Sequence, residues 1–162
     1  MRFRLAHRFD CTPTELWSIT DDEAFEQRLG KASDSKREKV EDDVTNGVRV
    51  VRRRITLQRE LPGPMRRVVG SNSISYDQIT RRAEGANTLE WEIEPMVLQG
   101  RFVGRGTTRV VETATGCERI IEGELTIKVP IVGAKMEKRL VDDVSASYEQ
   151  AAGIIREMLA AR

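Results

Sequence analysis

Hydrophobic and polar residues alternate along much of the chain, a pattern typical of half-buried β-strands. In residues 2–10 the hydrophobic positions share one face with His7, so His7 is expected to point inward beside Phe3 and Phe9. Short turns are expected between neighbouring strands. The same alternation predicts strands at about 74–82, 89–94 and 102–112, and a last strand that ends at Val129.

Residues 34–57 are expected to form a hairpin, because Asn46-Gly47 is a strong two-residue turn signal flanked by valines. The first arm, at 35–43, is very polar, and we expect it near a sheet edge or a wet interior surface. After the second arm, two prolines interrupt residues 61–70. That segment predicts a short helical turn or a mobile loop, and it is the best candidate for a gate.

Two short helices are predicted after the first strand. Thr12-Pro13-Thr14-Glu15 is a capping box with proline at the first helical position. Asp21 is expected to cap the second helix, and Gly30 is expected to end it.

A long helix is predicted at 131–161, directly after the strand that stops at Pro130. Such a helix would span about 45 Å. At 100° per residue its apolar positions form one stripe, which includes Leu140, Val144 and Tyr148. A strand that leads into a long closing helix indicates a sheet covered by that helix.

Length and composition predict one α+β domain over residues 1–162, large enough to bury its own core. The 27 basic and 26 acidic residues nearly cancel, which argues against a polyanion-binding tail. Cys11 and Cys117 are too few for a disulfide framework or a zinc cluster, and His7 is the only histidine. We therefore expect reduced thiols, no disulfide partner, no metal site and a cytoplasmic location.

The chain contains no run of about 18 apolar residues, so no membrane span is expected. Its first ten residues lack the continuous apolar stretch of a signal peptide. An arginine-rich segment at 49–54 could suggest nucleic acid, but strand alternation divides it between two faces and the acidic first arm of the hairpin offers partners. Nucleic-acid binding is not expected.

The predicted order of one strand, two small helices, six strands and a long C-terminal helix resembles the START-like (SRPBCC), helix-grip superfamily, which includes birch-pollen-allergen-like proteins and polyketide cyclases. Three motifs resemble, more narrowly, a family within it that is known as a domain of unknown function: His7-Arg8-Phe9 with Thr14-Glu15-Leu16-Trp17, the break at Pro62 and Pro64, and the segment 129–137. That family has two adjacent glycines where this chain has Gly133-Ala134.

The resemblance covers nearly the whole chain. It implies a helix-grip fold: a curved antiparallel sheet of about seven strands, two short N-terminal helices, and a long C-terminal helix over a cavity. It also implies binding of hydrophobic small molecules such as lipids, sterols or polyketides. A shared fold does not imply one chemistry.

Glu137 and His7 are the sharpest polar candidates. A carboxylate on an apolar helix face is costly to bury without a partner, although a position near the helix start favours its charge. His7 could be that partner, or an acid or base in the cavity. Alternatively, Glu137 pairs at the rim with an arginine or Lys128, and His7 is a hydrogen-bonded core residue.

Further ligand contacts are expected from aromatic and apolar side chains that face the cavity, with Arg53 as a possible holder of an anionic head group. Ordinary core packing is the alternative for all of them. The complete set of candidate ligand-binding residues is Tyr148, Leu140, Val144, Glu137, His7, Arg53, Tyr76, Trp91 and Phe102.

The sequence favours non-enzymatic binding of a hydrophobic small molecule, for transport, storage or sensing. No phosphate-binding loop or nucleophilic triad is present, so no catalytic residue, metal ligand or cofactor is assigned. One alternative is a cyclase or aromatase-like enzyme in which His7 or Glu137 moves a proton. A second alternative is an interaction module like the helix-grip domain that activates a heat-shock chaperone.

Overall fold

The computed structural model describes residues 1–58, 60–61, 63–70 and 73–162. Arg59 and Pro62 lie outside the described residues. In chain order the elements are β1 (Arg2–Phe9), α1 (Pro13–Thr20), α2 (Glu23–Ala32), β2 (Ser35–Thr45), β3 (Val48–Leu57), α3 (Gly63–Val69), β4 (Ser75–Ala83), β5 (Thr88–Pro95), β6 (Phe102–Thr113), β7 (Gly116–Ile127) and α4 (Gly133–Ala160).

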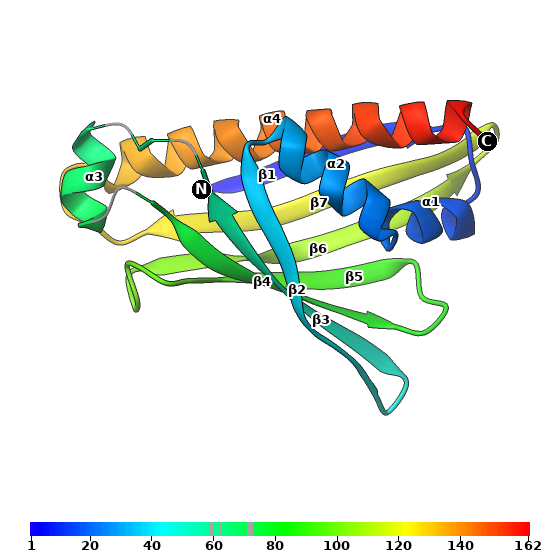
Figure 1. The fold of residues 1–162 in the computed structure, drawn as a ribbon, viewed down its shortest axis with the longest axis horizontal. Coiled ribbons are helices and arrows are strands. Elements are labelled where there is room, and N and C mark those ends of the chain that lie inside the picture. The colour runs from blue at the N-terminus through cyan, green and yellow to red at the C-terminus, as the bar shows by residue number, and fades with distance from the viewer. Residues whose placement is uncertain (59, 62, 71–72) are drawn as a thin grey trace.

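The strands form one antiparallel sheet in the order β1-β7-β6-β5-β4-β3-β2. It is strongly curved, and α4 runs along it on the side where β1 and β7 lie (Figure 1). The predicted α+β arrangement, with seven strands, two short N-terminal helices and a long C-terminal helix, is confirmed. Among the described residues, no helix combines the length and hydropathy needed to cross a bilayer.

The sheet has two edges, and each is protected in its own way. Strand β2 is one edge, with a bulge between Lys39 and Glu41, and most of its side chains are exposed and charged. Strand β1 is the other edge, where Arg156 of α4 donates to the Arg8 carbonyl at 3.1 Å.

The predicted hairpin turn is confirmed. Asn46 and Gly47 join β2 to β3 with φ angles of 52° and 74°. Two positive φ values are what a tight hairpin turn of this kind requires.

The second short helix differs from the prediction at both ends. Asp22, not Asp21, caps α2, because its Oδ1 accepts from the Ala24 amide at 2.9 Å. The helix continues past Gly30. A Cβ at Gly30 would lie 2.9 Å from the Ser35 carbonyl oxygen, so this glycine permits close packing against the start of β2 rather than ending the helix.

The long helix begins at Gly133, two residues later than predicted. Ile131 has φ 70°, which is outside helical geometry. The predicted continuity from the last strand into the helix is therefore interrupted by a sharp connection at 128–132.

The packed core lies at one end of the molecule, where the C-terminal half of α4 meets α1, α2 and the ends of β6 and β7. Ala151 and Ala152 let the helices approach closely. Cys11 and Cys117 are buried there as free thiols, with their sulfur atoms 3.9 Å apart. The N-terminal half of α4 contributes little to this core, which leaves it free to cover a cavity.

Candidate ligand-binding cavity

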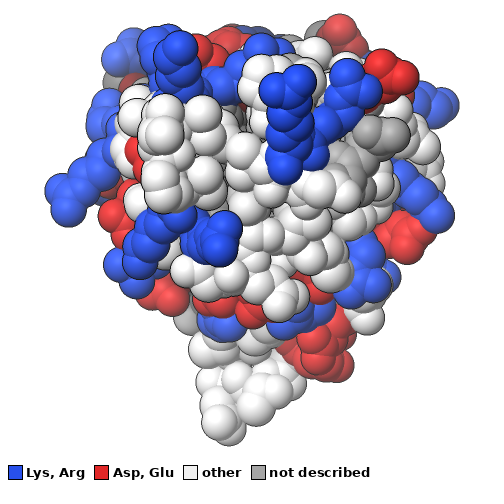
Figure 2. All heavy atoms as spheres, turned by 90° about the vertical axis from the view of Figure 1, so that its left-hand side faces the viewer, with Lys and Arg blue, Asp and Glu red and all other residues white. Residues whose placement is uncertain are grey.

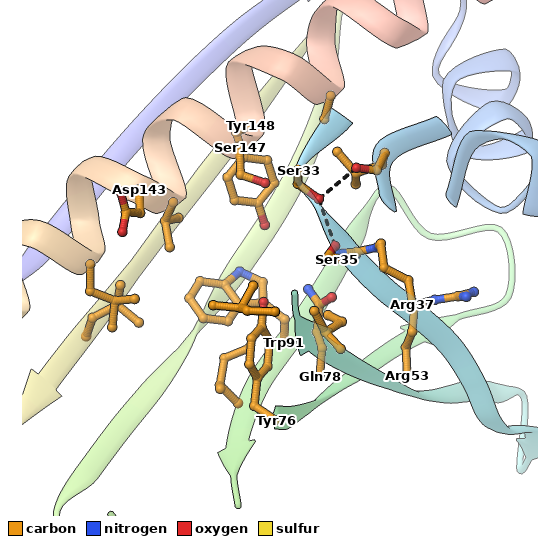
Figure 3. A pocket seen from close by; sticks show the side chains of 18 of the residues that line it. Ser33, Ser35, Arg37, Arg53, Tyr76, Gln78, Trp91, Asp143, Ser147 and Tyr148 are labelled. Carbon is orange, nitrogen blue, oxygen red and sulfur yellow. Dashed lines mark hydrogen bonds between the residues drawn. The ribbon is translucent and has the colours of Figure 1, made fainter. Parts of the chain in front are cut away.

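A cavity of about 650 Å³ lies between the concave face of the sheet and the N-terminal half of α4 (Figure 3). This volume is within the range of small-molecule sites, roughly 300–1,000 Å³. Most of the lining surface is apolar, and polar side chains contribute from α2, β2, β3, β4, β7 and α4. Seven of the sequence candidates line it: Arg53, Tyr76, Trp91, Phe102, Leu140, Val144 and Tyr148.

Trp91 lies against two glycines on the neighbouring strands. A Cβ at Gly106 would lie 2.5 Å from Trp91 Cζ2, and one at Gly123 would lie 2.6 Å from Cη2. The Phe3 ring packs beside the indole with centroids 6.0 Å apart. Because Gly106 and Gly123 have no side chain, the indole of Trp91 can pack directly against the sheet at the cavity floor.

The indole N–H of Trp91 is buried without a hydrogen-bond partner among the described residues. An unpaired buried donor costs about 1–3 kcal/mol. Trp17, in contrast, donates its indole N–H to Asn87 Oδ1 at 3.1 Å. Trp91 is therefore the tryptophan whose donor no described protein group satisfies.

Tyr148 reaches from α4 with its hydroxyl directed into the cavity, on the side facing Trp91 (Figure 3). Burial raises the pKa of this phenol, so it stays protonated at neutral pH. It can donate a hydrogen bond to a ligand or accept one from it.

Arg119, from β7, is a lining residue that the sequence analysis missed. Its guanidinium carbon lies 5.4 Å from the Tyr148 ring centre and 5.3 Å from that of Phe9. Its Nε has no partner among the described residues, and burial lowers its pKa to about 10. Arg119 shares strand parity with Ile121, and this inward direction was the signal available in the sequence.

His7 points inward as predicted, but it is not among the cavity-lining residues in the described structure. Its Nε2 is 2.9 Å from Glu149 Oε1, and its Nδ1 is 3.4 Å from Arg119 Nη2. An arginine can only donate, so Nδ1 accepts and Nε2–H donates to Glu149. His7 is a hydrogen-bonded core residue, which corrects its interpretation as a cavity group.

Glu137 is also outside the described lining, and it does not contact His7. Its Oε1 accepts from the Ile127 amide at 2.8 Å, and its Oε2 lies 3.3 Å from the N-terminal amine of Met1. The Ile127 amide, chiefly, holds the pKa of this carboxyl below its usual value. Glu137 joins the start of α4 to the end of β7, so the interpretation as a ligand contact is replaced by a structural one.

Arg53 lines the cavity, but its charge is already neutralised. Its Nη2 lies 2.8 Å from Glu23 Oε1, and its Nε lies 3.5 Å from Glu26 Oε2. Arg37 pairs with the same Glu26 carboxylate at 2.6 Å. The resulting network gives the wall below α2 a polar but balanced character, which does not favour an anionic head group.

The candidate gate at 61–70 contains α3, and Pro62 of this segment lies outside the described residues. Leu61, Met65 and Val69 contribute apolar side chains to the lining. Polar residues missed by the sequence analysis complete the wall; those visible in Figure 3 are Ser33, Ser35, Arg37, Gln78, Asp143 and Ser147. The part of the chain that the structure describes contains no cluster of metal-ligating side chains.

The neutral state of His7 predicts a pH dependence of stability. Burial, reinforced by Arg119, lowers the pKa of His7 from 6.5. Below about pH 6.5 the unfolded chain binds more protons than the folded chain, so the free energy of unfolding should fall as the pH falls towards the lowered pKa. His7→Gln retains a neutral donor and acceptor, and it should lose about 1 kcal/mol at neutral pH.

Urea unfolding of both proteins between about pH 7.5 and 5 measures this effect. The difference in unfolding free energy between the original protein and His7→Gln should shrink as the solution becomes more acidic. A difference that stays constant over this range would contradict the assignment of a neutral His7.

Residues 4–159 match the model of the family described as "Protein of unknown function (DUF2505)". Among curated proteins, none matches the chain at significant similarity.

Solved structures resemble the chain over nearly its full length. TTHA0849 from Thermus thermophilus is 13% identical with a TM-score of 0.70, covering 99% of this chain and 98% of that one. The ZhuI aromatase/cyclase from Streptomyces sp. R1128 is 10% identical with a TM-score of 0.64, covering 98% and 92%. Ara h 8.0201 is 12% identical with a TM-score of 0.64, covering 96% and 97%. These similarities confirm the helix-grip fold, and the match over residues 4–159 shows that the chain belongs to the DUF2505 family of unknown function.

Proposed function

We propose that the protein binds a hydrophobic small molecule, such as a lipid, a sterol-like compound or a polyketide-like compound, in its internal cavity. Transport, storage or sensing, without catalysis, would follow from such binding. The observation that carries the proposal is the largely apolar cavity of about 650 Å³ whose wall contains the unpaired Trp91 indole N–H. Residues 1–162 would act as one binding domain, and the two free thiols fit a reducing compartment such as the cytoplasm.

The lining predicts a ligand with an apolar body and at least one hydrogen-bond acceptor. Burial of apolar surface would contribute roughly 25 cal/mol per Å², before the cost of ordering the ligand is subtracted. An acceptor near Trp91 would pair the indole N–H, and the Tyr148 hydroxyl would bind a second polar atom. These groups would orient the ligand along the cavity.

The structure supports binding more than the two alternatives. The cyclase alternative depended on His7 or Glu137 as proton carriers, and both are held by protein groups outside the described lining. The chaperone-activator alternative favours a tightly packed interior, whereas the concave face here encloses a cavity. The named aromatase/cyclase shares only the fold at 10% identity.

Native mass spectrometry of the freshly purified protein tests the proposal directly. We expect a copurifying hydrophobic molecule, released on denaturation and identified by extraction. A protein that carries no such molecule, and that also fails to bind the apolar probe 1-N-phenylnaphthylamine in a fluorescence titration, would contradict it.

Replacement of Trp91 by Phe should weaken ligand binding about fivefold to tenfold, because the ring is retained and the only hydrogen-bond donor of the indole is lost. The melting temperature should fall by a few degrees, because the smaller ring leaves space above Gly106 and Gly123, whereas no protein hydrogen bond of that N–H is lost among the described residues. Trp17→Phe is the comparison: Trp17 also lines the cavity, but its N–H is bonded to Asn87, so this variant should lower stability and weaken affinity less than Trp91→Phe does. Loss of stability without loss of affinity in Trp91→Phe would oppose a ligand contact.

A further inference from the structure

Three connecting segments meet at the end of the molecule that carries α3. They are residues 63–70, which contain α3, residues 96–101 between β5 and β6, and residues 128–135 between β7 and α4 (Figure 1, left). The Lys128 amide donates to the Arg101 carbonyl at 2.7 Å, which joins the second segment to the third. We refer to these three segments together as the α3-end surface.

The α3-end surface is basic, although the whole chain is nearly neutral. Its three segments contain no aspartate or glutamate. Figure 2 views this end and shows an uncharged centre with Lys and Arg side chains around it, and with Asp and Glu side chains towards the rim of the view. Its basic residues are all exposed, and within the described structure none has an ion-pair partner: Arg66, Arg67, Arg101, Lys128 and Lys135.

Arginines on the outer face of the sheet behave differently. Arg81 pairs with Glu92, and Arg105 pairs with Glu124, both at 2.9 Å. The free cations of the α3-end surface are therefore a local feature of the described structure, and they leave it with an uncompensated positive charge.

Ile131 belongs to the third segment of this surface, between Lys128 and Lys135 in the chain. Its side chain is 100% exposed, and its backbone has φ 70°. A positive φ is unfavourable for a β-branched residue, and full exposure of an isoleucine gains nothing from burial. Ile131 adopts this conformation in spite of both costs, which suggests that its side chain contacts something outside the chain. Met96, which is 45% exposed, adds a second apolar group at the same end.

The same segments also form a wall of the cavity. Met65 and Val69 of α3 line it, as do Val97 and Leu98 of the β5–β6 connection. Segments 63–70 and 96–101 therefore contribute basic side chains to the α3-end surface and apolar side chains to the cavity lining. A partner on this surface would lie beside the cavity.

We propose that the α3-end surface docks on a lipid bilayer that contains anionic phospholipids. The five basic side chains would contact the headgroups, and Ile131 would enter the interface between headgroups and acyl chains. A nucleic acid is a poorer fit, because the three segments contain no aromatic residue on which a base could stack. The inference does not depend on what occupies the cavity.

Flotation with two kinds of vesicle tests the docking. One kind contains phosphatidylcholine alone, and the other contains roughly 30 mol % phosphatidylglycerol in phosphatidylcholine. The protein should float with the anionic vesicles only, and raised salt should release it. Equal binding to both kinds, or binding to neither, would overturn the proposal.

Two sets of variants locate the contact. Lys128→Glu combined with Lys135→Glu should weaken vesicle binding about 25-fold or more, because each basic residue near an anionic surface strengthens binding about fivefold. The matched control is Lys31→Glu with Arg162→Glu, which changes net charge equally and should retain binding. Ile131→Asp should weaken binding about tenfold, whereas Val44→Asp on the exposed β2 edge should not.

Melting curves accompany each variant, and Ile131→Asp should fold at least as well as the original, since aspartate tolerates positive φ better than isoleucine. Equal losses in the test and control variants would overturn the proposal. So would equally tight binding of a single-stranded RNA that depends on the same lysines. Ligand copurification is a separate readout, so failure of the docking and failure of the cavity proposal are distinguishable.

Discussion

Replacing Gly106 with alanine should lower the free energy of unfolding by about 3 kcal/mol, and the melting temperature by roughly 10 °C. The new methyl group would overlap the Glu122 backbone carbonyl on β7, which cannot move without disturbing the sheet. It would also press on Trp91 Cζ2 at 2.5 Å and tilt the indole into the cavity. Ligand affinity should therefore fall together with stability.

Gly153→Ala is the matched control. Within α4, a Cβ at this position meets no described atom within 4 Å. Alanine should raise the free energy of unfolding by about 1 kcal/mol, because glycine is unfavourable inside a helix. Thermal unfolding and urea titration measure both variants. If Gly106→Ala were as stable as the original protein, the space under Trp91 would be larger than the structure shows.

Val144→Trp should reduce ligand binding about tenfold by narrowing the cavity. Val144 faces the cavity from α4, opposite the sheet, and an indole there would project into the space between α4 and the sheet that a ligand needs. Because the new ring enters existing space rather than a packed core, stability should stay within about 1.5 kcal/mol of the original. Native mass spectrometry and titration with 1-N-phenylnaphthylamine measure the loss.

Lys138→Trp adds the same side chain to the exposed face of α4 and should leave binding intact. A Val144→Trp protein that retains its ligand would contradict internal binding and would move the site to the outside of the molecule. Unfolding of Val144→Trp would instead show that this part of α4 is tightly packed. Each result thus separates an internal site from a surface site.

Alternation and turn residues were sufficient to predict most of the strands and the long helix, whereas the helix-grip arrangement of these elements was predicted from the resemblance to a known superfamily. The inward positions of Trp91 and Phe102 follow from a period of two, and Asn46-Gly47 located the hairpin. The apolar stripe of α4 correctly predicted which helix covers the sheet. These features depend on neighbours in sequence, which a single chain displays directly.

The details of the candidate site depended on contacts between distant residues. Nothing local in the sequence shows that Glu137 accepts from the Ile127 amide, or that Glu149 and Arg119 hold His7. Glu137 and His7 have no evident partner among their neighbours in sequence, but in the structure both are hydrogen-bonded to residues distant in sequence. Arg119 shows the opposite case, because its inward parity was visible but a buried arginine is rare enough to be overlooked.

The two sheet edges have a consequence for the protein at high concentration. An exposed strand edge offers a template on which another chain can add, which is a common route to aggregation. The charged, bulged β2 and the Arg156 side chain against the β1 backbone each obstruct such addition. Loss of the β2 charges would leave a strand edge on which another copy of the chain can add, so the protein would then be expected to self-associate at high concentration.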